Sequence, residues 1–427
     1  MLDPKFIREN LDAVRANCLA RNARVDLDRF TSLDEGRRQA ITRLEEMRRA
    51  LNDLSSRMKG GMEKPERERL IAEGKSQKAE IQDAEAQVAQ IEAEFDSLMR
   101  SIPNMTHPDA PVAATEEGNR EIRRHGEPRK FGFRPLDHLE LGARLDLIDF
   151  ETGAKVAGQK FYYLKNEAVL LEQALINFSL QRLVKAGFVP VATPDMARES
   201  ILDGIGFNPR GEETQIYSVA NTDLCLIATA EITLGGMLSD TVLDEANLPL
   251  RYAGVSHCFR TEAGAAGRES KGLYRVHQFS KVEMFAFTTP EESERTHEEF
   301  VRMEEDLFQA MGIPYRVMDI CTGDLGGPAY RKYDLEAWMP GRGEGGEFGE
   351  VTSTSNCTDY QARRLGIRFR REGEKRPIHV HMVNGTAVAI SRALIAILEN
   401  YQEADGSVTV PEALVPHMAG VKKICRS

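Results

Sequence analysis

Charged and aromatic side chains recur along residues 255–287, where two strand-like stretches flank a loop of small and charged residues. Five of them are of types suited to nucleotide chemistry: Arg260, Glu262, Arg275, Phe279 and Glu283. Because side chains alternate along a strand, the first two are expected to share a face of the first stretch, and the last three a face of the second. An arginine, a ring and a carboxylate could serve a phosphate, a flat base and an ammonium group. An amphipathic hairpin with its charges in water would show the same periodicity.

A second candidate is Arg392, which lies inside the apolar stretch 387–398. A helix that is apolar on nearly all sides is expected to be buried, and a buried guanidinium needs an anion. The partner is either a ligand phosphate, to which arginine is well suited, or an internal carboxylate. Both interpretations are open at this point.

A third candidate is the stretch 350–353, Glu-Val-Thr-Ser, which follows a glycine-rich run. Its carboxylate and hydroxyl, three residues apart, could bind a hydrated Mg²⁺ ion, which prefers oxygen ligands. A strand after a flexible loop would look the same. His379 and His381 share a strand face, but no further Cys or His spacing supports a zinc site, so both are interpreted as structural.

The size and composition of the chain bound the elements that position these residues. The chain has 427 residues, more than one domain usually holds, and a hydrophobic content of 41% supports a packed core. No apolar run approaches the ~20 residues of a membrane helix, and the charged start, MLDPKFIREN, indicates no signal peptide. Six scattered cysteines indicate a reducing cytoplasm. The net charge of −11 argues against non-specific nucleic-acid binding, yet allows a local basic surface.

The first hundred residues have the hydrophobic spacing of a coiled coil. Apolar positions recur every three or four residues from 40 to 58 and again, more regularly, from 81 to 102, with a Gly-Gly pair at 60–61 between them. This spacing predicts an antiparallel coiled-coil hairpin at about 35–100, inside an N-terminal domain of residues 1–105. The first helix and the tip are basic and the returning helix is acidic. Such a surface is either merely solvated or touches a polyanion near the tip.

The rest of the chain has a mixed helix and strand pattern. Residues 106–135 are rich in Pro, Gly and charge and are predicted to be a linker to a domain of residues 136–427. Adjoining strand-like stretches favour an α+β fold, a mostly antiparallel sheet flanked by helices. The expected strands are 161–166, 252–260, 273–288, 313–320 and 378–383, and the expected helices are 168–186 and 387–401. A Rossmann site and a P-loop are excluded because neither motif occurs.

Taken in order, several segments resemble the seryl-tRNA synthetases, a family of class II aminoacyl-tRNA synthetases. The most specific are TAE at 229–231, FRTEAGAAGRESKGLYRVHQFSKVE at 259–283, EVTSTSNCTDYQARRLG at 350–366 and NGTAVAISR at 384–392. The resemblance extends to the start of the chain, the hairpin and the closing residues 410–420. It implies a class II antiparallel sheet of six or seven strands in a catalytic domain, and a homodimer.

The resemblance also implies a reaction. L-serine and ATP, with Mg²⁺, would give seryl-adenylate and pyrophosphate, and serine would then pass to the 3′ end of tRNA(Ser). Arg260 and Arg392 would be catalytic. The implied serine pocket consists of Thr229, Ala230, Glu231, Glu283, Asn384 and Thr386. The implied ATP site consists of Arg260, Thr261, Glu262, Arg275, Phe279, Glu350, Val351, Thr352, Ser353 and Arg392, with Mg²⁺ on Glu350 and Ser353. Lys281, on the same strand, is expected to have no substrate role.

The resemblance further implies that the hairpin binds the variable arm of tRNA(Ser), which its basic residues would contact: Arg43, Arg48, Arg49, Arg57, Lys59 and Lys64. Serine recognition is expected to need no zinc, because the cysteine ligands of the zinc-dependent branch are missing. The expected enzyme is cytoplasmic, without a membrane partner. Three alternatives stay open: charging of the selenocysteine tRNA as well, a non-catalytic tRNA-binding paralogue, and a ligase that loads an amino acid onto a carrier protein.

Overall fold

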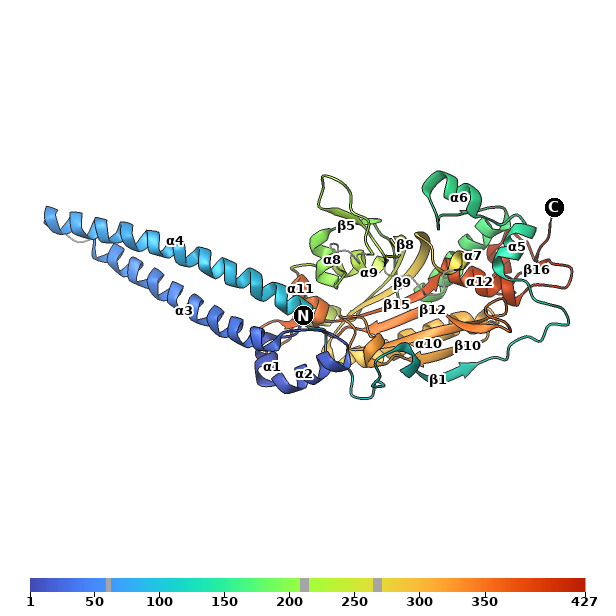
Figure 1. Cartoon of the computed structure of the whole chain (residues 1–427), viewed down its shortest axis with the longest axis horizontal. Helices are drawn as coiled ribbons and strands as arrows, with labels where there is room; N and C mark the ends of the chain where they lie inside the picture. Colours follow the sequence, from blue (N-terminus) through green and yellow to red (C-terminus); the bar gives the residue numbers. More distant parts are fainter. Residues whose placement is uncertain (59–62, 208–214, 264–270, 427) are drawn as a thin grey trace. The chain divides into compact units, whose positions relative to one another are not determined.

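The computed structural model describes residues 1–58, 63–207, 215–263 and 271–426 (Figure 1). The chain divides into two compact units, Met1–Met105 and Thr106–Ser427. Within the described residues, none of the helices combines the length and apolar character needed to cross a membrane.

The first unit is helical and is dominated by an antiparallel pair of long helices, α3 (Leu27–Arg57) and α4 (Lys64–Ser101). Two short helices, α1 (Pro4–Glu9) and α2 (Leu11–Ala20), precede the pair. Asp26 caps α3 by accepting a hydrogen bond from the Arg29 backbone, and proline occupies the first turn of α4, where its missing N–H costs nothing. The helical hairpin is confirmed, although α3 begins earlier than position 35. The predicted Gly-Gly break lies outside the described residues.

Buried side chains and ion pairs set the register between the two long helices. Leu44 and Leu54 of α3 and Leu70, Ile81 and Phe95 of α4 are buried along the seam. Three ion pairs join the outer surfaces: Arg29–Glu94, Arg37–Glu92 and Arg48–Glu85. As the number rises along α3 it falls along α4, as an antiparallel coiled coil requires.

The second unit is built on an eight-stranded sheet in the order β1-β10-β11-β12-β15-β9-β8-β4. Its strands are β1 (Arg120–His125), β4 (Val189–Ala192), β8 (Leu250–Phe259), β9 (Gln278–Thr288), β10 (Tyr315–Asp319), β11 (Arg331–Met339), β12 (Glu347–Asn356) and β15 (His381–Ala389). All neighbours are antiparallel except β4 and β8. The expected six or seven strands become eight. One edge strand, β1, lies inside the stretch 106–135 that is expected to be a linker.

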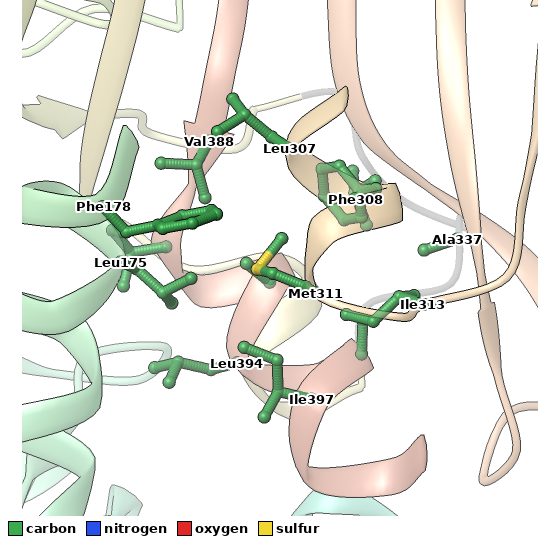
Figure 2. Packing of buried hydrophobic residues seen from close by; sticks show 14 of the residues in the cluster. Leu175, Phe178, Leu307, Phe308, Met311, Ile313, Ala337, Val388, Leu394 and Ile397 are labelled. Carbon is green, nitrogen blue, oxygen red and sulfur yellow. The ribbon is translucent and has the colours of Figure 1, made fainter. Parts of the chain in front are cut away.

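One face of the sheet packs against α7 (Glu167–Lys185), α10 (Ser293–Ala310) and α12 (Ile390–Asn400). Figure 2 shows Leu175 and Phe178 of α7, Phe308 of α10 and Leu394 of α12 around Met311. Burying each such side chain stabilises the fold by about 1.5–3 kcal/mol. The predicted helix 168–186 and strand 313–320 are present close to these limits, as α7 and β10, and their apolar side chains pack in this core. The strand expected at 378–383 instead extends to Ala389 as β15, so the helix expected from 387 begins at Ile390.

The other face of the sheet carries a smaller core and leaves room for a pocket. Along β9, Met284 belongs to the first core, whereas Phe285 and Phe287 belong to the second. The second core is closed by three short helices: α8 (Glu199–Ile205), α9 (Ala230–Gly236) and α11 (Tyr360–Leu365). These helices cover only part of the face, so polar residues of β9, β12 and β15 remain accessible beside them.

Candidate active site

A polar cavity of about 200 Å³ lies on this second face, over β9, β12 and β15 and beside the start of α9. Most of the residues predicted from the sequence line it: Thr229, Glu231, Arg260, Glu262, Arg275, Phe279, Glu283, Glu350, Val351, Thr352, Ser353, Asn384, Thr386 and Arg392. Ala230 and Thr261 are not among the lining residues. Ala230 is fully buried in the second core, and the Thr261 backbone N–H donates to the carbonyl of Gln215 at 3.0 Å.

The predicted limits of the two strands that carry Arg260, Glu262 and Arg275 are wrong, although these residues reach the pocket. β8 ends at Phe259 and β9 begins at Gln278. Arg260 and Glu262 therefore lie beyond the end of a strand, and Glu262 adopts a positive φ of 53°. Arg275 lies before the start of β9, where it forms an ion pair with Glu262 at 3.2 Å. Strand alternation does place Phe279 and Glu283 on one face, as expected.

One end of the pocket is rich in cations. The Arg260 guanidinium lies 5.3 Å from the centroid of the Phe279 ring, an aromatic contact that holds both side chains in place. Arg392 projects from α12, lies over the Tyr274 ring at 4.7 Å, and pairs with the Glu350 carboxylate at 2.9 Å. The internal carboxylate that one interpretation of Arg392 predicted is therefore Glu350. Because Arg392 and Glu350 both line the cavity, Arg392 also lies where the other interpretation, a contact with a ligand phosphate, requires it. Burial alone would raise the pKa of Glu350, but Arg392 and Lys332 outweigh it and lower that pKa below its ordinary value.

A β-bulge decides the geometry of the Glu350–Ser353 pair. In a regular strand, residues three apart point to opposite faces. Here Glu350 pairs with Glu336 and Thr352 with Leu335, so Val351 is an extra residue in β12. The bulge returns Glu350 and Ser353 to the same face. It also turns the Thr352 hydroxyl to the opposite face, where it donates to buried Glu304 at 2.8 Å.

The other end of the pocket holds buried carboxylates and hydroxyls. Glu231 follows Thr229, whose hydroxyl accepts a hydrogen bond from the Glu231 backbone N–H at 3.2 Å and caps α9. Glu283 lies opposite Thr386 in the β9–β15 ladder, and the Thr386 hydroxyl donates to it at 3.3 Å. Burial, reinforced by Glu283, raises the pKa of Glu231 to about 7. A carboxyl group with a pKa near 7 is only partly ionised at neutral pH, so it is suited to lose its proton when a cation binds beside it.

Two residues without a role assigned from the sequence stand inside this cluster. Lys281 is 5% exposed, and its ammonium lies 2.7 Å from the Thr229 hydroxyl and 2.5 Å from the Glu283 carboxylate. These contacts do not support the expectation that Lys281 has no substrate role. It shares strand parity with Phe279 and Glu283, so the alternation that selected them could have found it. Gln361, which donates to Glu231 at 2.8 Å, comes from α11 and carries no such signal.

The sheet also has a buried polar support behind the pocket. Glu304 of α10 is 1% exposed and accepts hydrogen bonds from the hydroxyls of Thr352 and Thr354. Burial raises the pKa of Glu304 well above its ordinary value. These contacts fix the orientation of β12, whose other face presents Ser353 to the pocket.

Five of the six basic residues predicted for the hairpin are among the described residues, and all five are exposed. Arg48 pairs with Glu85 across the hairpin at 2.7 Å, and Arg49 pairs with Glu45 along α3 at 3.7 Å. Arg43, Arg57 and Lys64 are exposed and make no ion pair within the part of the chain that the structure describes. Lys59 lies outside the described residues. Among described residues no group of three or more His, Cys, Asp or Glu is arranged for a metal ion; metal-free serine recognition stays a prediction.

The fold and the pocket define a class of proteins. Residues 216–401 match the family model of the class II tRNA synthetase core domain, for the G, H, P, S and T enzymes. A prolyl-tRNA synthetase of Giardia lamblia, solved with prolyl-adenylate, has a similar fold, with a TM-score of 0.56 at 15% identity over 65% of this chain and 54% of that one. The second unit is accordingly a class II aminoacyl-tRNA synthetase core.

Full-length relatives narrow the class. Residues 1–106 match the model of the seryl-tRNA synthetase N-terminal domain. The serine–tRNA ligase of Treponema denticola is 56% identical over 98% of both chains. The seryl-tRNA synthetase of Pyrococcus horikoshii, crystallised with ATP, superposes with a TM-score of 0.89 at 41% identity over 100% of both chains. The chain belongs to the seryl-tRNA synthetase family, a family of serine–tRNA ligases.

Proposed function

We propose that this chain activates L-serine with ATP in the cavity and transfers the seryl group to the 3′ end of tRNA(Ser). One observation carries the proposal: a single cavity has arginines and an aromatic ring at one end, and buried carboxylates and hydroxyls at the other. ATP suits the first end and a small hydroxylated ammonium compound the second. The substrate carboxylate would then attack the α-phosphorus between them, and pyrophosphate would leave.

At the ATP end, the protein acts by positioning and neutralising charge. Arg260 would hold the α-phosphate and the serine carboxylate, and Phe279, which already contacts Arg260, would stack on the adenine. Glu262 would accept from the adenine amino group. Arg392 and Arg275, each now paired with a carboxylate, would exchange those partners for the outer phosphates. Positive charges gathered around the phosphates stabilise the negative charge that develops in the transition state.

The Glu350–Ser353 face fits a divalent cation that arrives with ATP. A carboxylate and a hydroxyl on one face are oxygen donors, and Mg²⁺ in nucleotide sites takes one or two carboxylates together with phosphate oxygens. Asp334 pairs with Ser353 in the ladder, and its buried Oδ1 has no hydrogen-bond partner among the described residues. The bound ion would neutralise charge on the phosphates.

At the serine end, Glu231 would meet the substrate ammonium and Glu283 with Thr386 the side-chain hydroxyl. The support is the pKa of about 7 at Glu231, because a nearby cation would draw off its proton. Asn384 and Thr229 complete the lining.

Exposed residues support proposals for tRNA binding and for quaternary structure. The exposed cations on α3 and at the start of α4 would contact tRNA phosphates, because counterion release favours such contacts even on an acidic protein. Exposed apolar side chains on α7 (Val169 and Leu170) and on the edge strand β4 (Val189) support a homodimer that covers them. A tRNA substrate supports a cytoplasmic activity.

Serine-dependent exchange of pyrophosphate into ATP tests the proposal directly. The purified chain should exchange with serine and far more slowly with threonine, alanine or glycine, and should then aminoacylate tRNA(Ser). Exchange without any transfer to tRNA would point to a carrier-protein ligase instead. Binding of tRNA without exchange would point to a non-catalytic paralogue, and either result would overturn the proposal. Charging of the selenocysteine tRNA is assayed in the same format.

A further inference from the structure

Lys281 contacts three polar side chains at the carboxylate end of the pocket. Its ammonium lies 2.7 Å from the Thr229 hydroxyl, 2.5 Å from the Glu283 carboxylate and 3.4 Å from the Thr386 hydroxyl. The side chain is only 6% exposed, and that of Glu283 is 2% exposed. A charged lysine in so enclosed a place is costly unless each of its hydrogens is used.

The hydrogen bonds of Lys281 are not all equally good. An ammonium has three N–H donors, and good N–H···O bonds fall below about 3.2 Å. The contact to Thr386 is longer than that, so one donor is only weakly used. Thr386 is also poorly engaged with Glu283, at 3.3 Å. A small polar ligand among these three side chains would improve the geometry of all of them.

The chemistry of the adjacent pair selects one group of serine. Lys281 can only donate and Glu283, when ionised, can only accept. A group that satisfies both at once must accept and donate simultaneously. The ammonium of the substrate only donates and its carboxylate only accepts, so in serine the hydroxyl alone has this property.

We propose that Lys281 is a specificity-determining residue, which donates a hydrogen bond to the substrate hydroxyl while that hydroxyl donates to Glu283. This inference rests on the proposed function and adds a donor to the acceptors assigned above. Alanine and glycine offer neither half of the interaction, and a thiol offers both only weakly. Threonine has the same hydroxyl, so its rejection must come from the fit of its methyl group and not from Lys281.

Lys281→Met tests the inference, because methionine keeps the length and the buried stem while removing the ammonium. The measurement is kcat/KM for serine, alanine and threonine in pyrophosphate exchange, with the KM for ATP alongside. For serine we expect a fall of about 10- to 100-fold, typical of a lost hydrogen bond to a charged group. The value for alanine and the KM for ATP should stay within about threefold, and the serine-to-threonine ratio should not change.

Ser280→Ala is the matched control, since Ser280 is the neighbouring residue of β9 and points to the other face of the strand. It should leave every ratio unchanged. An equal fall for serine and alanine in Lys281→Met would overturn the inference and reduce the residue to a structural one. A wild-type chain without serine-dependent exchange would instead overturn the proposed function, so the two failures are distinguishable.

A second pair of variants keeps the test decisive if Lys281→Met does not fold, as the loss of one buried charge partner can cause. Glu283→Gln and the double variant Glu283→Gln/Lys281→Met are compared. If Lys281 contacts the hydroxyl itself, the double variant should lose about a further tenfold in its serine-to-alanine ratio. If Lys281 only holds Glu283 in place, the two ratios will be equal, which overturns the inference.

Discussion

Ion pairs of similar length occur in the helical hairpin and in the pocket, yet their surroundings are opposite. Arg48 and Glu85 lie 2.7 Å apart with side chains 55% and 45% exposed. Lys281 and Glu283 lie 2.5 Å apart with side chains 6% and 2% exposed. An exposed pair contributes about 0–1 kcal/mol, whereas removing one partner of a buried pair costs about 3–5 kcal/mol. Charge therefore fixes the geometry of the pocket, whereas the exposed pair adds little to the stability of the hairpin.

The largest effect should come from Arg392→Ala, which removes a 14% exposed guanidinium together with its ion pair to Glu350. Pyrophosphate exchange should fall by at least about 100- to 1000-fold, the usual cost of a lost transition-state donor, while the melting temperature shows a folded protein. The control is Arg371→Ala, whose surface pairs with Glu245 and Glu291 lie outside the cavity. Normal exchange in Arg392→Ala would contradict the assignment of the site.

Deleting residues 39–95 and rejoining the ends should show that the hairpin and the pocket serve different steps of the reaction. No lining residue of the cavity lies in that range, so pyrophosphate exchange should persist at the wild-type rate. Aminoacylation should fall by about 100-fold through weaker tRNA binding, because the phosphate contacts of the arm are lost. If tRNA affinity and its salt dependence survived the deletion, the arm would be a spacer and the paired charges merely solvated.

A change of pH should have a moderate effect on stability and on serine affinity through the ionisation of Glu231. Its pKa is raised from 4.5 to about 7, so the folded state binds more protons than the unfolded state between these values. The free energy of unfolding should therefore fall as pH rises through that window, by at most about 1.4 kcal/mol per unit. Serine affinity should change in the opposite sense and improve roughly tenfold from pH 6 to pH 8, because the ionised form binds the ammonium.

Glu231→Gln provides the comparison for this prediction. The variant should bind serine weakly at every pH and should lose both slopes. Calorimetry in buffers of different ionisation enthalpy should detect a proton released on serine binding by the wild type alone. A wild-type affinity that stays flat from pH 6 to pH 8 would mean that Glu231 is already ionised in the free protein.

The smallest effects belong to single arginines of the hairpin. Arg48→Ala breaks an exposed pair, so the free energy of unfolding should change by less than about 1 kcal/mol. Arg43, which makes no ion pair within the described part of the hairpin, offers the matched case. Each substitution should lower the slope of log affinity for tRNA against log salt by about one unit. A change in Arg48→Ala of several kcal/mol in stability would erase the contrast between the two regions.

Periodicity was sufficient for the elements that obey local rules. The heptads of residues 81–102 correctly predict that Ile81 and Phe95 of α4 are buried, because successive turns of a helix repeat the same environment. Alternation likewise predicts that Phe279 and Glu283 share a face of β9. The same alternation failed for Arg260, Glu262 and Arg275, because β8 ends before the first two, β9 begins after the third, and nothing local marks these limits.

The sequence by itself determined the hairpin, the strand-rich second unit and, through its long motifs, the family. Only the tertiary structure decided which side chains of the site contact one another. The bulge at Val351 depends on pairing with β11, the partner of Arg392 comes from β12, and Gln361 reaches Glu231 from α11. Local periodicity is set by neighbours a few residues away, whereas the contacts of Arg392 with Glu350 and of Gln361 with Glu231 join residues 42 and 130 positions apart and depend on strand register and burial. Two identical side chains in one cavity also differ for this reason: burial and Glu283 raise the pKa of Glu231, whereas Arg392 and Lys332 lower that of Glu350.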